Sequence, residues 1–394
     1  MLGERLAVRV QRLESVDVLR GVVMILMALD HVRDYFGAPG NPTDPARASA
    51  ALFFTRWVTH VCAPVFFLLT GTGAYLARRR RSLPDLSRFL ISRGIWLVAL
   101  ELTLFRCFAY QFNVDYRVTM LVILWALGWS MIALGALVHL PIAAIAATGI
   151  AMIVGHNAFD GIRAASLGRL APLWTVLHGQ GVVIGPPHLV FVAYPLVPWI
   201  GVTAAGYALG RIFDWTPDRR RRWLFRAGVA LAAAFVVLRA ANVYGDPSPW
   251  RAQATSVRTL LSFLNATKYP PSLLFLLMTL GPALVLLAWL DRGTPKVFAP
   301  VLTFGRVPLF YFLLHLPLIH LAAVVVCSLR YGSAHWMFES PTLARYPFTT
   351  PPGWGYSLPF VYAMWAALVV ALYPLCRWFA EVKQRRRTWW LSYL

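Results

Sequence analysis

Ionisable side chains lie inside the first apolar stretch that is long enough to cross a membrane, about residues 17–37, and they are Asp17, Arg20, Asp30, His31 and Arg33. A charged group in the hydrocarbon costs roughly 2.5–3.5 kcal/mol on insertion scales, so such groups persist where they face the protein interior or a water-filled cavity. A neutral imidazole accepts a proton near neutral pH, and a neighbouring carboxylate such as Asp30 can orient it and raise its basicity. His31 is therefore a candidate general base.

One face of this stretch has two chemically different ends. A series of residues at spacings of three and four lies on the same side of a helix: Asp17, Arg20, Met24, Met27, His31 and Asp34. At 1.5 Å per residue, His31 lies about 16 Å beyond Arg20 along the helix axis. An anion could bind at the Arg20 end and a proton could be taken up at the His31 end. The alternatives are an ion pair between Arg20 and Asp17, and a buried histidine with a structural role.

Three further histidines lie in apolar stretches. His60 lies about ten residues into the second stretch, at a depth similar to that of His31, so the two could meet and His60 is the rival general base. In the ninth stretch His315 and His320 lie on different helix faces. We favour His315 for substrate binding because Tyr311, on the same face, can share its hydrogen bond. Haem or metal ligation is disfavoured because no two of these histidines are three or four residues apart, and no metal is expected.

Three cations outside the first stretch also stand at positions where a ligand could arrive. Arg306 begins the ninth stretch and Arg93 lies early in the third, both near the predicted inner surface. A guanidinium pairs with phosphate through two parallel hydrogen bonds. Lys268 precedes the eighth stretch at the outer mouth, where it is either a substrate contact or an interfacial cation whose stem lies along apolar surface.

Composition identifies an integral membrane protein. Of the 394 residues 59% are hydrophobic and 13% are charged, whereas about 25% of a soluble protein is charged. The net charge of +21 would suggest nucleic acid as a partner of a soluble protein. Here the basic residues cluster at the ends of apolar runs, as the positive-inside rule expects, so no nucleic-acid partner is predicted. The four cysteines form no CxxC pair, which argues against a zinc site or a disulfide framework.

The apolar runs predict an all-α, polytopic bundle of about ten transmembrane helices with both termini cytoplasmic. We expect a cytoplasmic segment at 1–16, one bundle at 17–380 and a basic cytoplasmic tail at 381–394. Three long outer loops would cover the mouth of the bundle. The predicted spans are about 17–37, 51–76, 88–107, 118–138, 141–156, 188–210, 223–244, 271–290, 301–329 and 357–380.

Four motifs resemble a known family. They are R-x-x-S-V-D-V-L-R-G-x-x-M-x-x-M-x-x-D-H at 12–31, T-H-x-C-A-P-V-F-F-x-L-x-G-T at 59–72, K-Y-P-P-S-L at 268–273 and F-G-R-V-P-L-F-Y at 304–311. This pattern is similar to the bacterial multi-pass proteins related to heparan-α-glucosaminide N-acetyltransferase, which are transmembrane acyltransferases. The resemblance implies acetyl-CoA as a cytosolic co-substrate and a sugar or glycan-like acceptor on the far side, with a homodimer left open. The Arg- and Ala-rich composition without a targeting signal favours a bacterial inner membrane.

The resemblance assigns roles to the residues above, with one departure. Arg20, Arg306 and Arg93 would bind the phosphates of acyl-CoA, and Lys268 with His315 and Tyr311 would contact the acceptor. In the lysosomal enzyme that names the family, the catalytic histidine lies between the first two spans. The corresponding stretch here, GAPGNPTDPARASA, has no histidine, so the base would be His31 or His60. The alternative function is a transporter or flippase of an anionic or lipid-linked solute that uses the same histidines as a proton relay.

Overall fold

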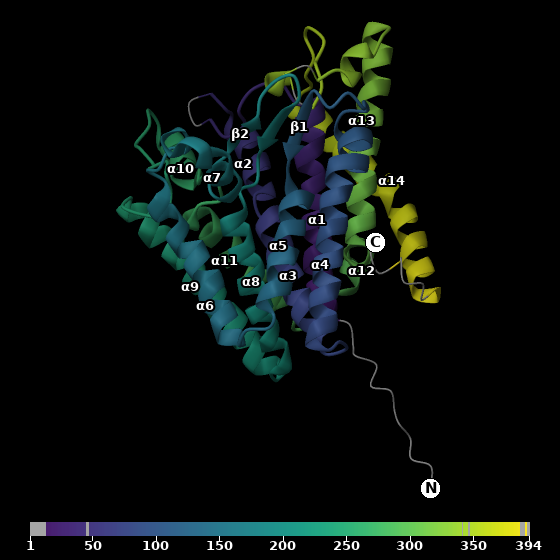
Figure 1. The fold of residues 1–394 in the computed structure, drawn as a ribbon. Coiled ribbons are helices and arrows are strands. Elements are labelled where there is room, and N and C mark those ends of the chain that lie inside the picture. The colour runs from purple at the N-terminus through teal and green to yellow at the C-terminus, as the bar shows by residue number, and fades with distance from the viewer. Residues whose placement is uncertain (1–12, 45–46, 341, 346, 387–390, 392–394) are drawn as a thin grey trace.

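Helix α1 runs through the middle of a helical bundle (Figure 1). The computed structural model describes residues 13–44, 47–340, 342–345, 347–386 and 391. The α-helices are α1 (Glu14–Phe36), α2 (Ala50–Thr59), α3 (Cys62–Arg78), α4 (Leu83–Leu100), α5 (Ile123–Leu137), α6 (Ile142–Gly155), α7 (Ala171–Leu177), α8 (Leu196–Leu209), α9 (Pro217–Ala241), α10 (Ser256–Leu264), α11 (Leu273–Leu290), α12 (Ala299–Arg306), α13 (Pro308–Tyr331) and α14 (Leu358–Arg385). A π-helix, η1 (Glu101–Tyr110), continues α4, and short 3-10 helices include η2 (His156–Phe159) and η4 (Gly210–Asp214).

Seven helical segments in the described part of the chain are long and apolar enough to cross a membrane, which confirms an integral, multi-pass membrane protein. Helices α1 and α5 stand in the same bundle, but charge interrupts α1 and α5 has only 15 residues. The count of ten spans and the side of the termini therefore stay predictions. The seven segments are Ala50–Arg78, Ile142–Phe159, Leu196–Asp214, Pro217–Ala241, Leu273–Leu290, Pro308–Tyr331 and Leu358–Arg385.

Two predicted spans begin as strands instead of helix. A small sheet with the order β1-β3-β2 joins β1 (Val118–Leu121), β2 (Gly181–Ile184) and β3 (Leu189–Val192). β1 is parallel to β3, with Val118 opposite Leu189, and β2 is antiparallel to β3. The prediction of helix from 118 and from 188 is wrong at these ends, because a short apolar run of β-branched and aromatic residues has the hydropathy of a membrane helix. The helices begin only at Ile123 and Leu196.

Two predicted spans are also broken within their length. A turn at His60 and Val61 separates α2 from α3. Val307, with φ −131° and ψ 50°, separates α12 from α13, as expected for a residue before proline. Arg306 therefore ends one helix and His315 belongs to the next, so the two side chains can be oriented independently.

Backbone-to-backbone packing joins α1 to α12. A Cβ atom at Gly305 would lie 1.7 Å from the carbonyl oxygen of Asp17, and one at Gly21 would lie 2.0 Å from that of Val301. Only glycine permits this approach. As a result Arg20 and Arg306, each next to one of these glycines, lie at the same level, and Arg20 donates a hydrogen bond to the carbonyl of Gly305 (3.2 Å).

The two ends of the bundle differ. Figure 1 shows β1, β2, α7 and α10 at one end, and α12 at the other. We call the first the sheet end, and we call the opposite end, where Arg20, Arg306 and Lys383 lie, the basic end. Because α1 runs from the basic end to the sheet end, the expected order of Arg20 and His31 along the bundle is confirmed.

Candidate active site

The three arginines predicted to bind phosphate line one cavity at the basic end. Arg20 from α1, Arg93 from α4 and Arg306 from α12 meet there with Lys383 from α14, around a volume of about 300 Å³. Among the described residues, none that lines this cavity carries a carboxylate. The deeper wall is apolar and includes Met24, Leu97, Leu124, Leu127 and Phe312. The cavity thus combines a cationic rim with an apolar depth.

Ion pairs hold two of these arginines without using up their donors. Arg20 Nη1 lies 2.9 Å from Asp17 Oδ1, so the predicted ion pair is present. The bond from Arg20 to Gly305 also uses Nη1, whereas a guanidinium carries five N–H donors. Arg306 Nη2 lies 3.9 Å from Glu14 Oε1, and its side chain is 30% exposed. Neither pairing excludes a second, anionic partner.

A second cavity, of about 310 Å³, lies at the sheet end. It takes in His31, Asp30 and Lys268, three of the predicted site residues. Asp34, from the same face of α1 as His31, also lines it. Side chains that the sequence analysis did not single out share the lining: Tyr35, Arg56, Thr59, Tyr110, Tyr194 and Tyr269. The lining is therefore polar and carries charges of both signs, as suits a polar acceptor.

His31 presents its ring to this cavity. Its side chain is 21% exposed, its Nδ1 lies 3.9 Å from Asp34 Oδ2, and among the described residues no hydrogen bond reaches the ring. Asp30, expected to orient His31, instead accepts hydrogen bonds from Arg33 (2.9 Å) and from Arg56. The carboxylate that faces the His31 ring is Asp34, whose other oxygen accepts a hydrogen bond from Arg33 (2.6 Å).

The other base candidate and His31 do not meet as the sequence suggested. His60 is 3% exposed, its ring packs 5.3 Å from that of Phe275, and it is not part of the described cavity lining. The neighbour of His31 is His315, whose ring centroid lies 5.2 Å away. The geometry therefore favours His31 over His60 as the group that faces a substrate.

His315 is fixed by backbone and not by Tyr311. Its Nδ1 lies 2.7 Å from the carbonyl oxygen of Phe312, so Nδ1 carries the proton and the buried Nε2 has no hydrogen-bond partner among the described residues. The Tyr311 hydroxyl also has none, and its ring stacks on the imidazole at 5.5 Å. The expected hydrogen bond between the two side chains is wrong, because the α13 carbonyls are nearer acceptors. Both residues lie behind His31.

His320 links the sheet end together. Its Nε2 lies 2.7 Å from the carbonyl oxygen of Met337 and its Nδ1 3.2 Å from that of Ala109. Its ring stacks on Phe112 at 3.9 Å. These contacts join α13 to η1 and to the segment after it, which gives His320 a structural role.

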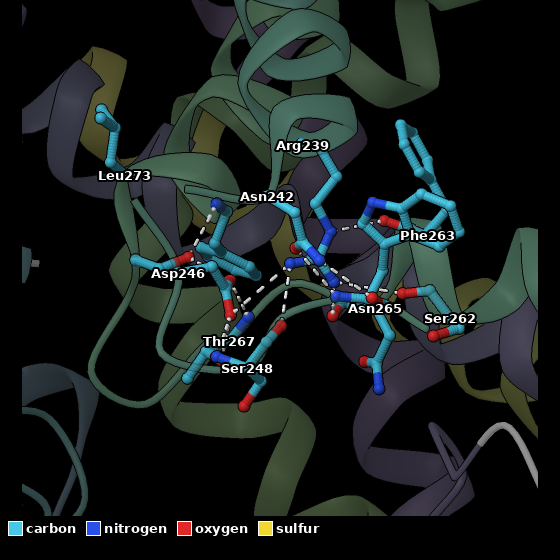
Figure 2. Close-up of polar contacts among 12 residues, drawn as sticks. Arg239, Asn242, Asp246, Ser248, Ser262, Phe263, Asn265, Thr267 and Leu273 are labelled. Atoms are coloured by element: carbon cyan, nitrogen blue, oxygen red, sulfur yellow. Dashed lines mark hydrogen bonds and ion pairs between the residues drawn. The ribbon is translucent and has the colours of Figure 1, made fainter. Parts of the chain in front are cut away.

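A buried network holds the turn that carries Lys268 and Tyr269 into the sheet-end cavity (Figure 2). Asp246 Oδ2 accepts hydrogen bonds from the backbone N–H of Thr267 (2.8 Å) and from the Ser272 hydroxyl (2.7 Å). Both ends of the K-Y-P-P-S turn are thus attached to one carboxylate.

Arg239 completes this network. Its guanidinium lies 3.8 Å from Asp246 and its side chain is 1% exposed. It donates hydrogen bonds to the backbone carbonyls of Ser248, Ser262, Phe263 and Asn265. Since these carbonyls lie before α10, in its last turn and directly after it, Arg239 ties the whole loop to α9, as Figure 2 shows.

We expect the substitution Asp246→Asn to destabilise this turn. The asparagine amide would put an N–H in place of the oxygen that now accepts hydrogen bonds from Thr267 and Ser272. Each buried polar group left without a partner costs about 1–3 kcal/mol. Thermal unfolding of the detergent-solubilised protein checks this. The control is Asp218→Asn, whose side chain is 72% exposed in its pair with Arg221, where loss should be nearly neutral. Equal melting temperatures of the two variants would contradict the proposed anchoring.

Cations dominate the electrostatics around Tyr269. Burial raises the pKa of the Tyr269 phenol, whereas the nearby cations of Lys268 and Arg56 lower it. The resulting pKa lies below the ordinary value of a tyrosine. Its hydroxyl lies 3.4 Å from that of Tyr194, and the Lys268 ammonium lies 5.1 Å from the ring centroid. A ligand with acceptor oxygens would find several donors here.

A thin apolar wall separates the two cavities. Ile123, the first residue of α5, lines both of them, while Met24 lines one and Met27 the other. The start of α5 is fixed by Glu101, whose side chain accepts a hydrogen bond from the backbone N–H of Leu124 (2.9 Å) and is buried. The two cavities thus adjoin each other at the Ile123 side chain.

Sequence reasoning missed three residues of the site. Arg56 lies four residues before His60, so helical spacing on the second stretch could have found it. Tyr269 lies inside the K-Y-P-P-S-L motif. Lys383 was assigned to the basic tail, and only the packing of α14 beside α12 brings it to the cavity.

A known protein family matches the part of the chain that contains the first nine α-helices. The family model described as heparan-alpha-glucosaminide N-acetyltransferase, catalytic, matches residues 12–244, more than half of the chain. No curated protein matches the sequence. The matched region contains Arg20, His31 and Arg93, whereas Lys268, Arg306 and His315 lie beyond it.

Proposed function

Because the chain belongs to the heparan-alpha-glucosaminide N-acetyltransferase family of transmembrane acyltransferases, we propose that it moves an acetyl group from acetyl-CoA to a sugar-like amine or hydroxyl across the membrane. The observation that carries this proposal is the pair of cavities along one face of α1, with only the Ile123 wall between them. One cavity suits a polyanionic donor and the other a polar acceptor.

The basic-end cavity suits the donor. Acetyl-CoA carries phosphates at one end and a thioester at the end of a flexible, largely apolar arm. Arg20, Arg93, Arg306 and Lys383 would pair with the phosphates, and the apolar depth would receive the arm. The thioester would then approach the wall at Ile123. Since basic residues favour the cytosolic side, this end would face the cytosol, in a bacterial inner membrane.

His31 would act as general base at the sheet end. As the acceptor nitrogen or oxygen attacks the thioester carbonyl, a new bond to the acetyl carbon forms, the carbon–sulfur bond breaks and CoA thiolate leaves. The acceptor proton goes to His31, which Asp34 faces and His315 supports. Such proton transfer contributes typically 10²- to 10⁴-fold in rate. Lys268 and Tyr269 would hold the acceptor.

The test uses the full chain reconstituted in liposomes, with labelled acetyl-CoA supplied on one side and a panel of amino sugars and hydroxyl sugars on the other. We expect labelled acetyl-sugar to form only when acetyl-CoA reaches the basic end. Absence of both acyl-CoA binding and product would overturn the enzyme proposal. Movement of an unmodified solute, independent of acyl-CoA, would establish the transporter alternative instead.

A further inference from the structure

Two histidines and an aspartate meet at the sheet end, outside both cavities. His156 belongs to η2, Asp160 follows that helix and His178 follows α7. One ligand atom from each lies within 4.8 Å of the other two. We propose that these three residues bind a divalent first-row transition-metal ion, Zn²⁺ by the chemistry of the donors. This inference does not rest on the proposed acyl transfer.

The first argument for a bound ion is the burial of His156. The residue is 3% exposed. Neither Nδ1 nor Nε2 makes a hydrogen bond of good geometry to the described residues, and the backbone of Pro271 interacts with the ring outside that geometry. A buried imidazole without a well-placed partner is costly, because each polar group removed from water needs one. The ring centroid of His178 lies 5.7 Å away in an edge-to-face arrangement, and one ligand atom from each ring belongs to the cluster described above.

The three donors form a recognised type of metal site. Two imidazoles and one carboxylate are ligands that zinc and its neighbours in the first row accept, with a fourth position left to water. His178 Nε2 lies 3.4 Å from Asp160 Oδ1. The other carboxylate oxygen of Asp160 accepts a hydrogen bond from Asn157 Nδ2 (2.7 Å), and an outer partner of this kind orients a ligating carboxylate.

The site would connect two parts of the sheet end. The side-chain oxygen of Asn157 accepts a hydrogen bond from the backbone N–H of Leu273 (2.8 Å), the first residue of α11. Leu273 directly follows the turn that Asp246 anchors, and Figure 2 shows it beside that network. A metal ion held by His156, Asp160 and His178 would therefore fasten the segment around α7 to the turn that carries Lys268.

This inference departs from the expectation that the protein has no metal. That expectation considered the four histidines of the membrane stretches. His156 and Asp160 are four residues apart in HNAFD, a spacing that places two ligands on one side of a helical turn. His178 could be joined to them only by the fold of the loop between α6 and β2.

The experiment is metal analysis of the purified full chain after chelator treatment, removal of any affinity tag and reloading with Zn²⁺. We expect stoichiometric zinc in the wild type and its loss in His178→Gln, with wild-type content in the control His188→Gln, an exposed histidine whose ring lies near the carbonyl of Tyr116. Added Zn²⁺ should raise the melting temperature of the wild type and of the control but not of His178→Gln.

Loading with Co²⁺ gives a second readout, the visible absorption of cobalt with nitrogen and oxygen ligands. If His178→Gln fails to fold, the cobalt absorption of the wild type and of Asp160→Asn can still be compared, so the proposal can still be refuted. Equal zinc content in wild type and His178→Gln, or a wild type that takes up neither metal, would overturn the proposal. None of these readouts depends on acyl transfer, so the two proposals fail separately.

Discussion

The His31→Gln protein should bind acetyl-CoA as tightly as the wild type and transfer the acetyl group about 10²- to 10⁴-fold more slowly. Glutamine keeps a polar side chain of similar reach in the sheet-end cavity, but its amide cannot accept a proton at neutral pH. The donor affinity should be unchanged because Arg20, which would pair with the donor's phosphates, lies about 16 Å from His31 along α1. Calorimetric titration of acetyl-CoA and product formation from labelled acetyl-CoA measure the two quantities.

The same assay distinguishes His31 from its rival. His60→Gln should have a smaller effect on kcat, since the His60 ring packs against Phe275 away from the described cavity lining. His315→Gln tests a positioning role: it should lower kcat less than His31→Gln and change the pH profile of the reaction, because His315 acts only through its contact with the His31 ring. A wild-type rate in His31→Gln, or a larger loss in His60→Gln, would reverse the assignment.

The double variant Arg93→Gln and Arg306→Gln should lose most of the affinity for acetyl-CoA. A hydrogen bond to a charged group contributes about 1.5–3 kcal/mol, so each substitution should raise Kd by roughly 10- to 150-fold. Loss of a phosphate contact should also make binding less sensitive to salt. Calorimetric titration with acetyl-CoA at two ionic strengths provides both results.

Arg88→Gln is the matched control. Arg88 lies on α4, five residues before Arg93, and its side chain is 83% exposed in a long pair with Asp85. It removes the same charge from the same helix without touching the cavity lining. Equal Kd values for Arg88→Gln and the double variant would mean that the basic end attracts acetyl-CoA only by its overall charge. Arg20 is not used in this comparison because its bonds to Asp17 and Gly305 also join α1 to α12.

Helical spacing was sufficient to place Arg20 and His31 toward opposite ends of one face of α1. Hydropathy placed Arg93 and Arg306 near the same surface as Arg20, since each lies close to the start of an apolar run on the predicted inner side. Spacing within one helix finds Arg33, three residues after Asp30, but not the second partner of this carboxylate. That carboxylate is taken by Arg56 of α2, and the pairing depends on how α2 packs on α1.

The strands and the helix breaks were not predictable from hydropathy. β1 and β3 pair because Val118 and Leu189 become neighbours, although they are separated by α5, α6 and the α7 loop. The family match ends at residue 244, yet Lys268, Arg306 and His315 complete the site from the unmatched part. The position of Arg306 follows from the close packing of α12 on α1 at Gly21 and Gly305, and that of Lys268 from the anchoring of its turn by Asp246. No local pattern contains these long-range contacts.

Ile123 also affects whether protons can leak across the membrane through the protein. Cavities lined by charged and hydroxyl groups would hold water, and a continuous file of water across a bilayer conducts protons down the membrane potential. An apolar side chain interrupts such a file, because a narrow hydrophobic constriction excludes water. With Ile123 between the cavities, two wet vestibules can approach each other while the lipid barrier stays sealed to protons. In the proposed reaction, the uncharged acetyl group would cross this constriction where an ion cannot.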